Sequence, residues 1–244
     1  MGIFGNLFEK KTCAICGGEI GLLGNRKLED GNLCKACAAK LSPFFSDRRR
    51  STVEQIREQL DYREANKAAV TALNVTRTLG DRTKILLDED AQRFVVTPSG
   101  GRWRDSNPDV MSFSQVTGCN VDVRTTREEL YREGPDGERV SYDPPRYDTD
   151  YDIYVIINVN TPYFDEIEFR INSMRIESPG SPDYQSAMDQ AREIKEALTS
   201  VRENVRAAVA EAAAPKAAVV CPHCGATTMP DANGRCEYCG GAVA

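Results

Sequence analysis

The chain has 244 residues, a formal net charge of −6 and nine cysteines, but only one histidine. A single histidine leaves few candidates for acid–base or nucleophilic chemistry that depends on imidazole. No run approaches the roughly 20 apolar residues of a membrane-spanning helix, and the start MGIFGNLFEKK lacks the features of a secretory signal. We therefore expect a soluble cytoplasmic protein without transmembrane segments.

Residues 1–11 form a separate N-terminal segment. Its apolar side chains, Ile3, Phe4, Leu7 and Phe8, share one face if the segment is helical. We expect this face to dock against the protein itself or a partner. A myristoylation signal is not expected, because Asn6 stands where serine or threonine is required.

Four C-x-x-C pairs, two near each end, are the strongest signal in the sequence. Two residues between thiolates let both sulfurs reach one tetrahedral Zn²⁺, and two pairs complete the coordination shell without an open position for water. We therefore predict two structural zinc ions and no catalytic metal. The predicted ligands are Cys13, Cys16, Cys34, Cys37, Cys221, Cys224, Cys236 and Cys239.

The first two pairs predict a treble-clef zinc finger over residues 12–46. Gly17 follows Cys16, where a zinc knuckle turns sharply, often with positive φ. The second pair, Cys34 and Cys37, is followed by AAKL, which predicts a short helix that carries the last two ligands.

The sequence from Cys13 to Leu60 resembles a bacterial zinc-finger family catalogued as domain-of-unknown-function family 4428. The motifs that carry the resemblance are C-x-x-C-G, GLLGNRKLEDG, C-x-x-C and KLSPFFSDRR. The resemblance implies that Cys13, Cys16, Cys34 and Cys37 bind the metal and that the protein lies in the bacterial cytoplasm. It implies no reaction.

Residues 47–69 predict a helical spacer. Ser51 and Glu54 fit a capping box, and apolar residues continue at helical spacing from Val53 to Leu60. The helix could pack on one side and link the finger to the next domain.

From residue 70 the apolar period changes to two, which predicts antiparallel strands. The predicted strands are Thr83–Leu87, Arg93–Thr97, Val110–Val123, Tyr151–Asn160 and Phe164–Asn172. The polar, proline-bearing stretch Gly134–Asp148 is interpreted as a mobile loop.

Pro182–Val205 predicts an amphipathic helix that packs on these strands, so the whole domain spans 70–205. Six or seven antiparallel strands followed by one helix resemble the pleckstrin-homology-like (PH-like) barrel, in pattern and without a residue motif. A generic α+β sandwich is the alternative.

Residues 206–219 are alanine-rich and contain Pro215, which predicts a linker that is helical at most in its first half. Residues 220–244 predict a compact zinc ribbon, with eleven residues between Cys224 and Cys236. This end resembles the double-knuckle zinc ribbons at the ends of bacterial and archaeal proteins. The fold class is therefore multidomain α+β.

Other interpretations of the cysteines are weaker. A redox C-x-x-C motif would need one pair near a βαβ pattern. His223 lies inside a knuckle and is interpreted as solvent-facing and not as a ligand. Cys119 lies in a strand-like stretch and is interpreted as a buried, inert thiol.

The distribution of charge along the chain indicates which classes of partner are favoured. Residues 1–65 carry eleven basic and nine acidic side chains, whereas residues 66–203 carry seventeen and twenty-five. An acidic middle domain disfavours anionic lipid, even if Arg77, Arg82 and Lys84 cluster. Only Arg48–Arg50 approaches the basic stripe of a nucleic-acid reader, and a solvated turn is the preferred interpretation.

The sequence contains no P-loop, G-x-S-x-G or H-E-x-x-H motif, so no catalytic residue is predicted and the protein is not expected to be an enzyme. The preferred hypothesis is a zinc-binding adaptor that mediates protein–protein interaction. The alternative is a nucleic-acid-associated zinc-ribbon protein.

Overall fold

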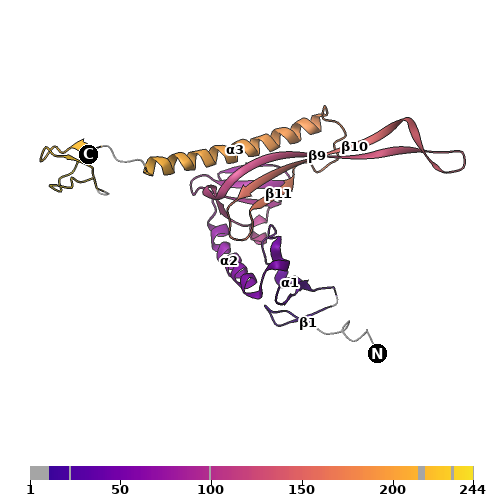
Figure 1. The fold of residues 1–244 in the computed structure, drawn as a ribbon, viewed down its shortest axis with the longest axis horizontal. Helices are drawn as coiled ribbons and strands as arrows, with labels where there is room; N and C mark the ends of the chain where they lie inside the picture. The colour runs from indigo at the N-terminus through magenta and orange to yellow at the C-terminus, as the bar shows by residue number, and fades with distance from the viewer. Residues whose placement is uncertain (1–10, 22, 99, 214–217, 232–233, 244) are drawn as a thin grey trace. The chain divides into compact units, whose positions relative to one another are not determined.

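The structure is a computed structural model that describes residues 11–21, 23–98, 100–213, 218–231 and 234–243. The predicted docking face at Ile3–Phe8 lies outside the described residues. The chain divides into two compact units, Met1–Arg202 and Glu203–Ala244, and each is described by itself. The described residues form a mixed α/β structure with several small sheets (Figure 1). Among them, no helix is both long and apolar enough to cross a membrane.

The first unit begins with two short hairpins and a one-turn helix. β1 (Lys11–Thr12) pairs with β2 (Glu19–Ile20), β3 (Arg26–Lys27) pairs with β4 (Asn32–Leu33), and α1 spans Lys35–Ala38. Their buried residues form a small core that includes two of the cysteines. Its members are Cys13, Ile20, Leu28, Leu33, Cys37, Leu41 and Ile56.

The helical spacer consists of the 3-10 helix η1 (Asp47–Arg50) and α2 (Val53–Ala72). The capping box is one residue later than predicted: the side chain of Thr52 accepts from the N–H of Gln55, and the side chain of Gln55 accepts from the N–H of Thr52. The Ser51 and Glu54 prediction was therefore wrong. Ser51 instead ends η1, with its hydroxyl donating to the carbonyl of Asp47 (3.0 Å).

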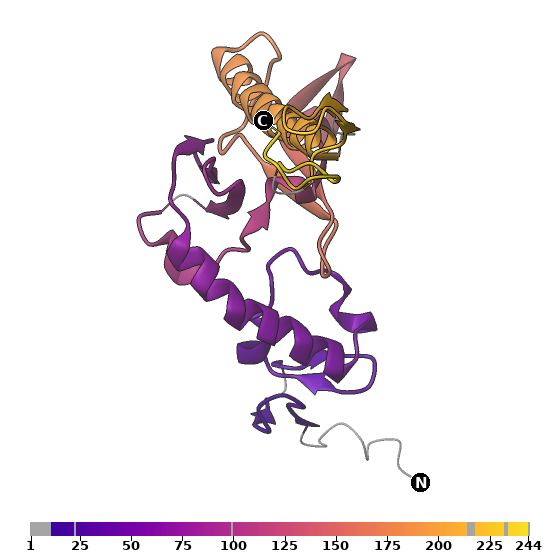
Figure 2. The same cartoon turned by 90° about the vertical axis from the view of Figure 1, so that its left-hand side faces the viewer.

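One face of α2 is buried along its length. Ile56 completes the core of the finger, while Gln59, Arg63, Asn66 and Val70 continue the same face toward the β-rich part. The finger lies beside the N-terminal half of this helix (Figures 1 and 2). The spacer is therefore part of one compact unit with its neighbours on both sides.

A four-stranded antiparallel sheet follows α2, in the order β5-β6-β7-β8. Its strands are β5 (Arg77–Leu79), β6 (Thr83–Asp88), β7 (Arg93–Pro98) and β8 (Met111–Ser112). The sequence did not predict β5. The 3-10 helix η2 (Trp103–Ser106) precedes β8. The 3-10 helix η3 (Phe113–Gln115) follows β8 and interrupts the predicted single strand Val110–Val123.

A three-stranded antiparallel sheet has the order β11-β10-β9. β9 spans Val116–Glu133, β10 spans Arg139–Val159 and β11 spans Glu166–Arg170. The predicted loop Gly134–Asp148 was wrong, because most of it belongs to β10 and only the turn between β9 and β10 is not strand. β11 pairs only with Tyr154–Asn158, so the distal parts of β9 and β10 form a two-stranded ribbon (Figure 1).

Helix α3 spans Pro182–Ala213, eight residues beyond the predicted end at Val205. It therefore occupies the first half of the predicted linker. Its fully or nearly fully buried residues in the first unit are Ala187, Ala191, Ile194, Ala197 and Leu198. It lies along β5 and β10: Arg77 of β5 pairs with Glu193, and the rings of Tyr151 and Tyr184 meet edge to face at 5.9 Å.

The second unit contains a hairpin of β12 (Val219–Val220) and β13 (Thr227–Thr228) and one isolated bridge, Arg235 to Ala242. Its core consists of Cys221, Cys236 and Val243. Among the described residues of the whole chain, no sheet closes into a barrel. The PH-like barrel predicted for residues 70–205 is therefore not confirmed.

Candidate metal centres

The first cysteine cluster lies in the finger. Cys13 and Cys16 come from the turn between β1 and β2, Cys34 caps α1, and Cys37 lies within α1. The four sulfur atoms all lie within 4.8 Å of one another, and Cys16 Sγ is 3.8 Å from Cys34 Sγ. The structure thus brings together all four residues that the sequence predicted for this site.

Backbone N–H groups point at these sulfurs. Cys34 N–H donates to Cys13 Sγ and Cys37 N–H donates to Cys34 Sγ, each at 3.3 Å. Burial by itself raises the pKa of Cys13, but backbone donors, those of Cys16 and Cys34 foremost, outweigh it and hold this pKa at about 6. Burial and the neighbouring thiols raise the pKa of Cys37 to about 12. Ionising all four sulfurs therefore calls for a cation among them.

The second cluster lies in the C-terminal unit and has the same geometry. Its four sulfurs, from Cys221, Cys224, Cys236 and Cys239, lie within 4.8 Å of one another. Cys221 Sγ is 3.6 Å from Cys239 Sγ, and Cys224 Sγ is 3.8 Å from Cys236 Sγ. The N–H of His223 donates to Cys221 Sγ and the N–H of Tyr238 donates to Cys236 Sγ, each at 3.4 Å.

In the second cluster, too, the pKa of one thiol is lowered and that of another is raised. Loss of hydration raises the pKa of Cys236, but the N–H groups of Cys239 and Tyr238 outweigh it and hold this pKa at about 6. The N–H of Gly241 lowers the pKa of Cys239, but the thiols of Cys221 and Cys224 outweigh that donor and raise it to about 12. Each cluster therefore has one sulfur that ionises readily and one that does not.

Three of the four knuckles repeat one backbone turn. In the first, Cys13 N–H donates to the carbonyl of Gly18 (2.9 Å) and Gly17 N–H donates to the carbonyl of Cys13 (2.8 Å). The knuckles that begin at Cys221 and Cys236 have the same two bonds at 2.8–2.9 Å. The glycine of each turn has a φ of +68 to +71°. Glycine is needed there because a Cβ strains a residue with positive φ.

The sulfur distances fit a zinc–thiolate centre. Four Zn–S bonds of about 2.3 Å in a tetrahedron place the sulfurs about 3.8 Å apart. The shortest sulfur distances here are 3.6–3.8 Å, and all nine cysteines are free thiols. Each cluster could therefore hold one metal ion, and an all-thiolate shell suits Zn²⁺ better than a hard cation.

His223 and Cys119 belong to neither sulfur cluster, and His223 contributes only its backbone N–H to one of them. His223 is exposed, and its ring packs over Gly241, where an added Cβ would lie 2.6 Å from Cδ2 of the ring. Cys119 is buried in β9 opposite Ile157, and burial raises the pKa of its thiol to about 11.

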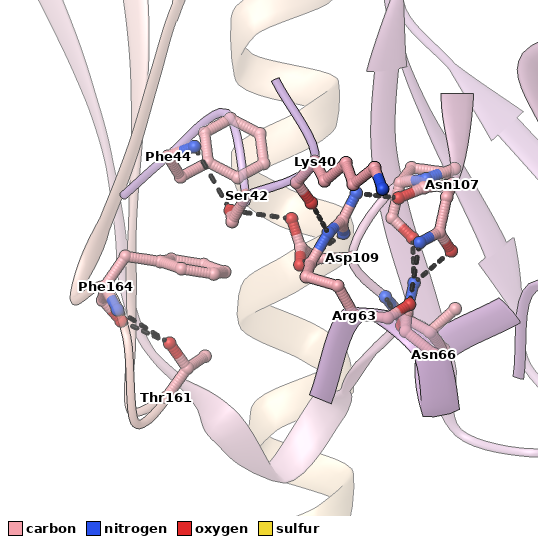
Figure 3. A network of polar contacts seen from close by, with 11 residues as sticks. Lys40, Ser42, Phe44, Arg63, Asn66, Asn107, Asp109, Thr161 and Phe164 are labelled. Atoms are coloured by element: carbon pink, nitrogen blue, oxygen red, sulfur yellow. Dashed lines mark hydrogen bonds and ion pairs between the residues drawn. The ribbon is translucent and has the colours of Figure 1, made fainter. Parts of the chain in front are cut away.

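A buried polar cluster between the finger and the β-rich part was not predicted (Figure 3). Arg63 Nη1 lies 2.7 Å from Asp109 Oδ1, and the hydroxyl of Ser42 donates to Asp109 Oδ2 (2.8 Å). Asn66 Nδ2 donates to the side chain of Asn107 and to the carbonyl of Pro108, each at 2.8 Å. Polar residues on a hydrophilic helix carry no apolar signal of burial, so the sequence pattern did not mark this cluster.

Comparison with known protein families finds a match for the N-terminal part of the chain. The family described as "Domain of unknown function (DUF4428)" matches residues 12–59, about a fifth of the chain. The match covers the first cysteine cluster and the first part of α2, and it confirms the resemblance inferred for that region. No curated protein and no solved structure matches the chain.

Proposed function

We propose that the chain is a non-catalytic adaptor of the bacterial cytoplasm that binds two structural Zn²⁺ ions and recognises a protein partner. The metal part of this proposal is supported by the two four-sulfur clusters and by the backbone donors aimed at their sulfurs. A shell of four thiolates leaves no open position at zinc for water or substrate, so the ions would stabilise the fold and not activate a reactant.

The observation that carries the adaptor role is the ribbon formed by the distal parts of β9 and β10. Leu130, Tyr131 and Tyr147 lie on this ribbon, and each is 43% exposed. Arg127 lies over the ring of Tyr147 (3.6 Å to the centroid) and Arg139 over the ring of Tyr131 (4.5 Å). Tyrosine and arginine are enriched at the centres of protein interfaces, and these stacks order both side chains before a partner arrives.

The PH-like architecture is part of the same proposal. A four-stranded meander, a three-stranded meander and a long helix follow one another along the chain, which is the element order expected of that architecture. The pairing of β9 with β10 continues well beyond the part of β10 that also pairs with β11. We assign this two-stranded ribbon to partner recognition.

Affinity capture from a lysate of the source organism, with chemical cross-linking, tests the role of the ribbon. The test variant combines Leu130→Ser and Tyr147→Ser, and the control is Met174→Ser, which changes a side chain that is 78% exposed and lies off the ribbon. We expect the wild type and the control to capture the same proteins and the ribbon variant to lose them. Capture of the same set by all three would contradict the proposed role.

A further inference from the structure

A concave groove of about 650 Å³ lies where β3 meets η1. Its lining includes Arg26, Lys27, Leu28, Glu29, Arg48 and Arg49. The buried side chain of Leu28 lies in the core of the finger, so the groove is built on a packed base. Four cationic residues therefore line one groove, together with a single acidic residue, Glu29.

None of these four cations has an ion-pair partner among the residues that the structure describes. Arg26 donates only to the backbone carbonyls of Leu23 and Asn25, at 3.4 and 3.3 Å. The Nε of Arg48 is buried and has no hydrogen-bond acceptor in the described structure. An unpaired buried donor is costly, so Arg48 would gain stability from any acceptor that a bound anion brings close to its guanidinium group.

The next arginine along the chain behaves differently. Arg50 is paired with Asp47, whose Oδ1 accepts from Nη2 at 2.5 Å and from Nε at 3.2 Å. Burial and the nearby charges of Arg26 and Arg49 lower the pKa of Arg48, whereas the bond to Asp47 raises the pKa of Arg50. Of the three consecutive arginines, Arg48 and Arg49 thus line the groove, and Arg50 is neutralised by its ion pair with Asp47.

We propose that this groove binds a soluble small ligand that carries a diphosphate group. Four cations against one carboxylate give the lining a net charge of +3, which a diphosphate of charge about −3 neutralises and a single phosphate of charge about −2 does not. Arginine suits this ligand because its planar group offers paired donors to phosphate oxygens.

The charge distribution favours a small ligand over a polymer. A nucleic acid or a membrane would extend past the groove, and residues 66–203 carry twenty-five acidic against seventeen basic side chains. A long polyanion needs a continuous basic track, and the residues that the structure describes show none beyond the groove. This inference goes beyond the adaptor role and does not depend on it.

Isothermal titration of the zinc-loaded full chain with inorganic pyrophosphate tests the proposal, with zinc content checked after each titration because pyrophosphate also binds metals. We expect saturable binding that weakens at least tenfold in the double variant Arg48→Gln/Arg49→Gln. The variant Arg50→Gln removes the same charge from the same 3-10 helix and should change the affinity less than twofold.

A second variant guards against a folding defect at the half-buried Arg48. Lys27 and Arg49 are both exposed, so Lys27→Gln/Arg49→Gln should fold normally and still weaken binding at least tenfold. Adenosine diphosphate should compete with pyrophosphate for the same site.

Three results would overturn the proposal. They are no pyrophosphate binding by the wild type at low salt, an equal loss in the Arg50→Gln control, and binding of single-stranded RNA or anionic vesicles that pyrophosphate does not displace.

Discussion

Arg63 and Asp109 form a buried ion pair across the junction between α2 and the loop that precedes β8, with 2.7 Å between Nη1 and Oδ1. Only 7% of the arginine side chain and none of the aspartate side chain is exposed. Arg63 also donates to the carbonyls of Lys40 and Asn107, and Ser42 donates to the other oxygen of Asp109 (Figure 3). The pair therefore ties the end of the finger, the middle of α2 and the β-rich part together.

The first prediction concerns this pair. Arg63→Met should lower the free energy of unfolding by about 3–5 kcal/mol, because it leaves the carboxylate of Asp109 buried without its partner. The control Lys67→Met breaks an exposed pair with Glu64 on the same helix and should cost less than about 0.5 kcal/mol. Urea unfolding of zinc-loaded protein, followed by the fluorescence of the single tryptophan, measures both.

Trp103 is a suitable probe because it packs against the cluster of Leu73, Leu86 and Val95 beside the junction. The double variant Arg63→Met/Asp109→Leu should lose less than the sum of its single variants, because neither charge is then left alone. Equal losses for Arg63→Met and Lys67→Met would show that the junction does not stabilise the fold.

The second prediction concerns metal removal. Each cysteine cluster sits in a core too small to be stable without its ion. A strong chelator should abolish hydrogen-exchange protection around Cys13–Leu41 and Cys221–Gly240 and also in the first turns of α2, because Ile56 belongs to the core of the finger. Protection should persist in Ile153–Val159 and Ile167–Ile171, where buried residues of the sheet make their own core.

Two outcomes of the same exchange experiment would contradict this account. Full protection at Ile56 after chelation would mean that α2 does not depend on the finger. Loss of protection throughout Ile153–Val159 would mean that the β-rich part has no stability of its own.

The third prediction concerns Cys119. Burial raises the pKa of its thiol to about 11, so at pH 8 only about one molecule in a thousand carries the reactive thiolate. N-ethylmaleimide should leave Cys119 unmodified in folded, zinc-loaded protein and label it once urea is added. Because the folded pKa lies above the unfolded value, this thiol also favours the folded state below about pH 9, and the stabilisation is lost as the pH rises to about 11. Rapid labelling of the folded protein at pH 8 would contradict this.

The fourth prediction concerns the knuckle glycine Gly17, which has a φ of +70° and no atom within 4 Å of an added Cβ. Gly17→Ala should destabilise the finger by about 1–2 kcal/mol through backbone strain alone, and the metal should pass to a competing chelator more readily. Gly21→Ala is the matched control, because Gly21 also has free space around an added Cβ but its φ is not positive. Equal metal loss in both variants would show that backbone strain at Gly17 is not the cause.

The sequence was most informative about the metal centres. Cysteine spacing predicted both clusters because two thiolates two residues apart are held together by local backbone geometry, which needs no knowledge of the distant fold. The turn glycines were predicted for the same reason. Even the misplaced capping box was wrong by one residue only, since Ser51, Thr52, Glu54 and Gln55 offer two overlapping motifs.

The long hairpin could not be predicted in the same way. Residues of a two-stranded ribbon have no covered face, so the distal parts of β9 and β10 lack the alternation of apolar and polar residues that marks a strand on a core, whereas the proximal part of β10 shows it. Pro144 and Pro145 also favoured a loop, and they lie where the pairing register shifts between Ser141 and Arg146. Prolines can thus lie inside a ribbon at an irregular position.

The end of α3 was left open by the sequence, which allowed a helix in the first half of the predicted linker, whereas the buried junction was missed. The alanine-rich stretch after Val205 has high helix propensity, and the structure continues the helix through it to Ala213. Arg63, Asn66 and Asp109 are polar and far apart in the sequence, so only the folded chain shows that they share one buried site.

The central claim is that each cysteine cluster holds one zinc ion through four thiolates. Native mass spectrometry of the full chain, purified under reducing conditions with zinc supplied, tests it most directly. We expect a mass increase equal to two zinc ions per chain, falling to one in a variant with Cys16→Ser and Cys34→Ser and to one in a variant with Cys224→Ser and Cys239→Ser. A wild-type chain that binds one zinc ion or none would contradict the claim.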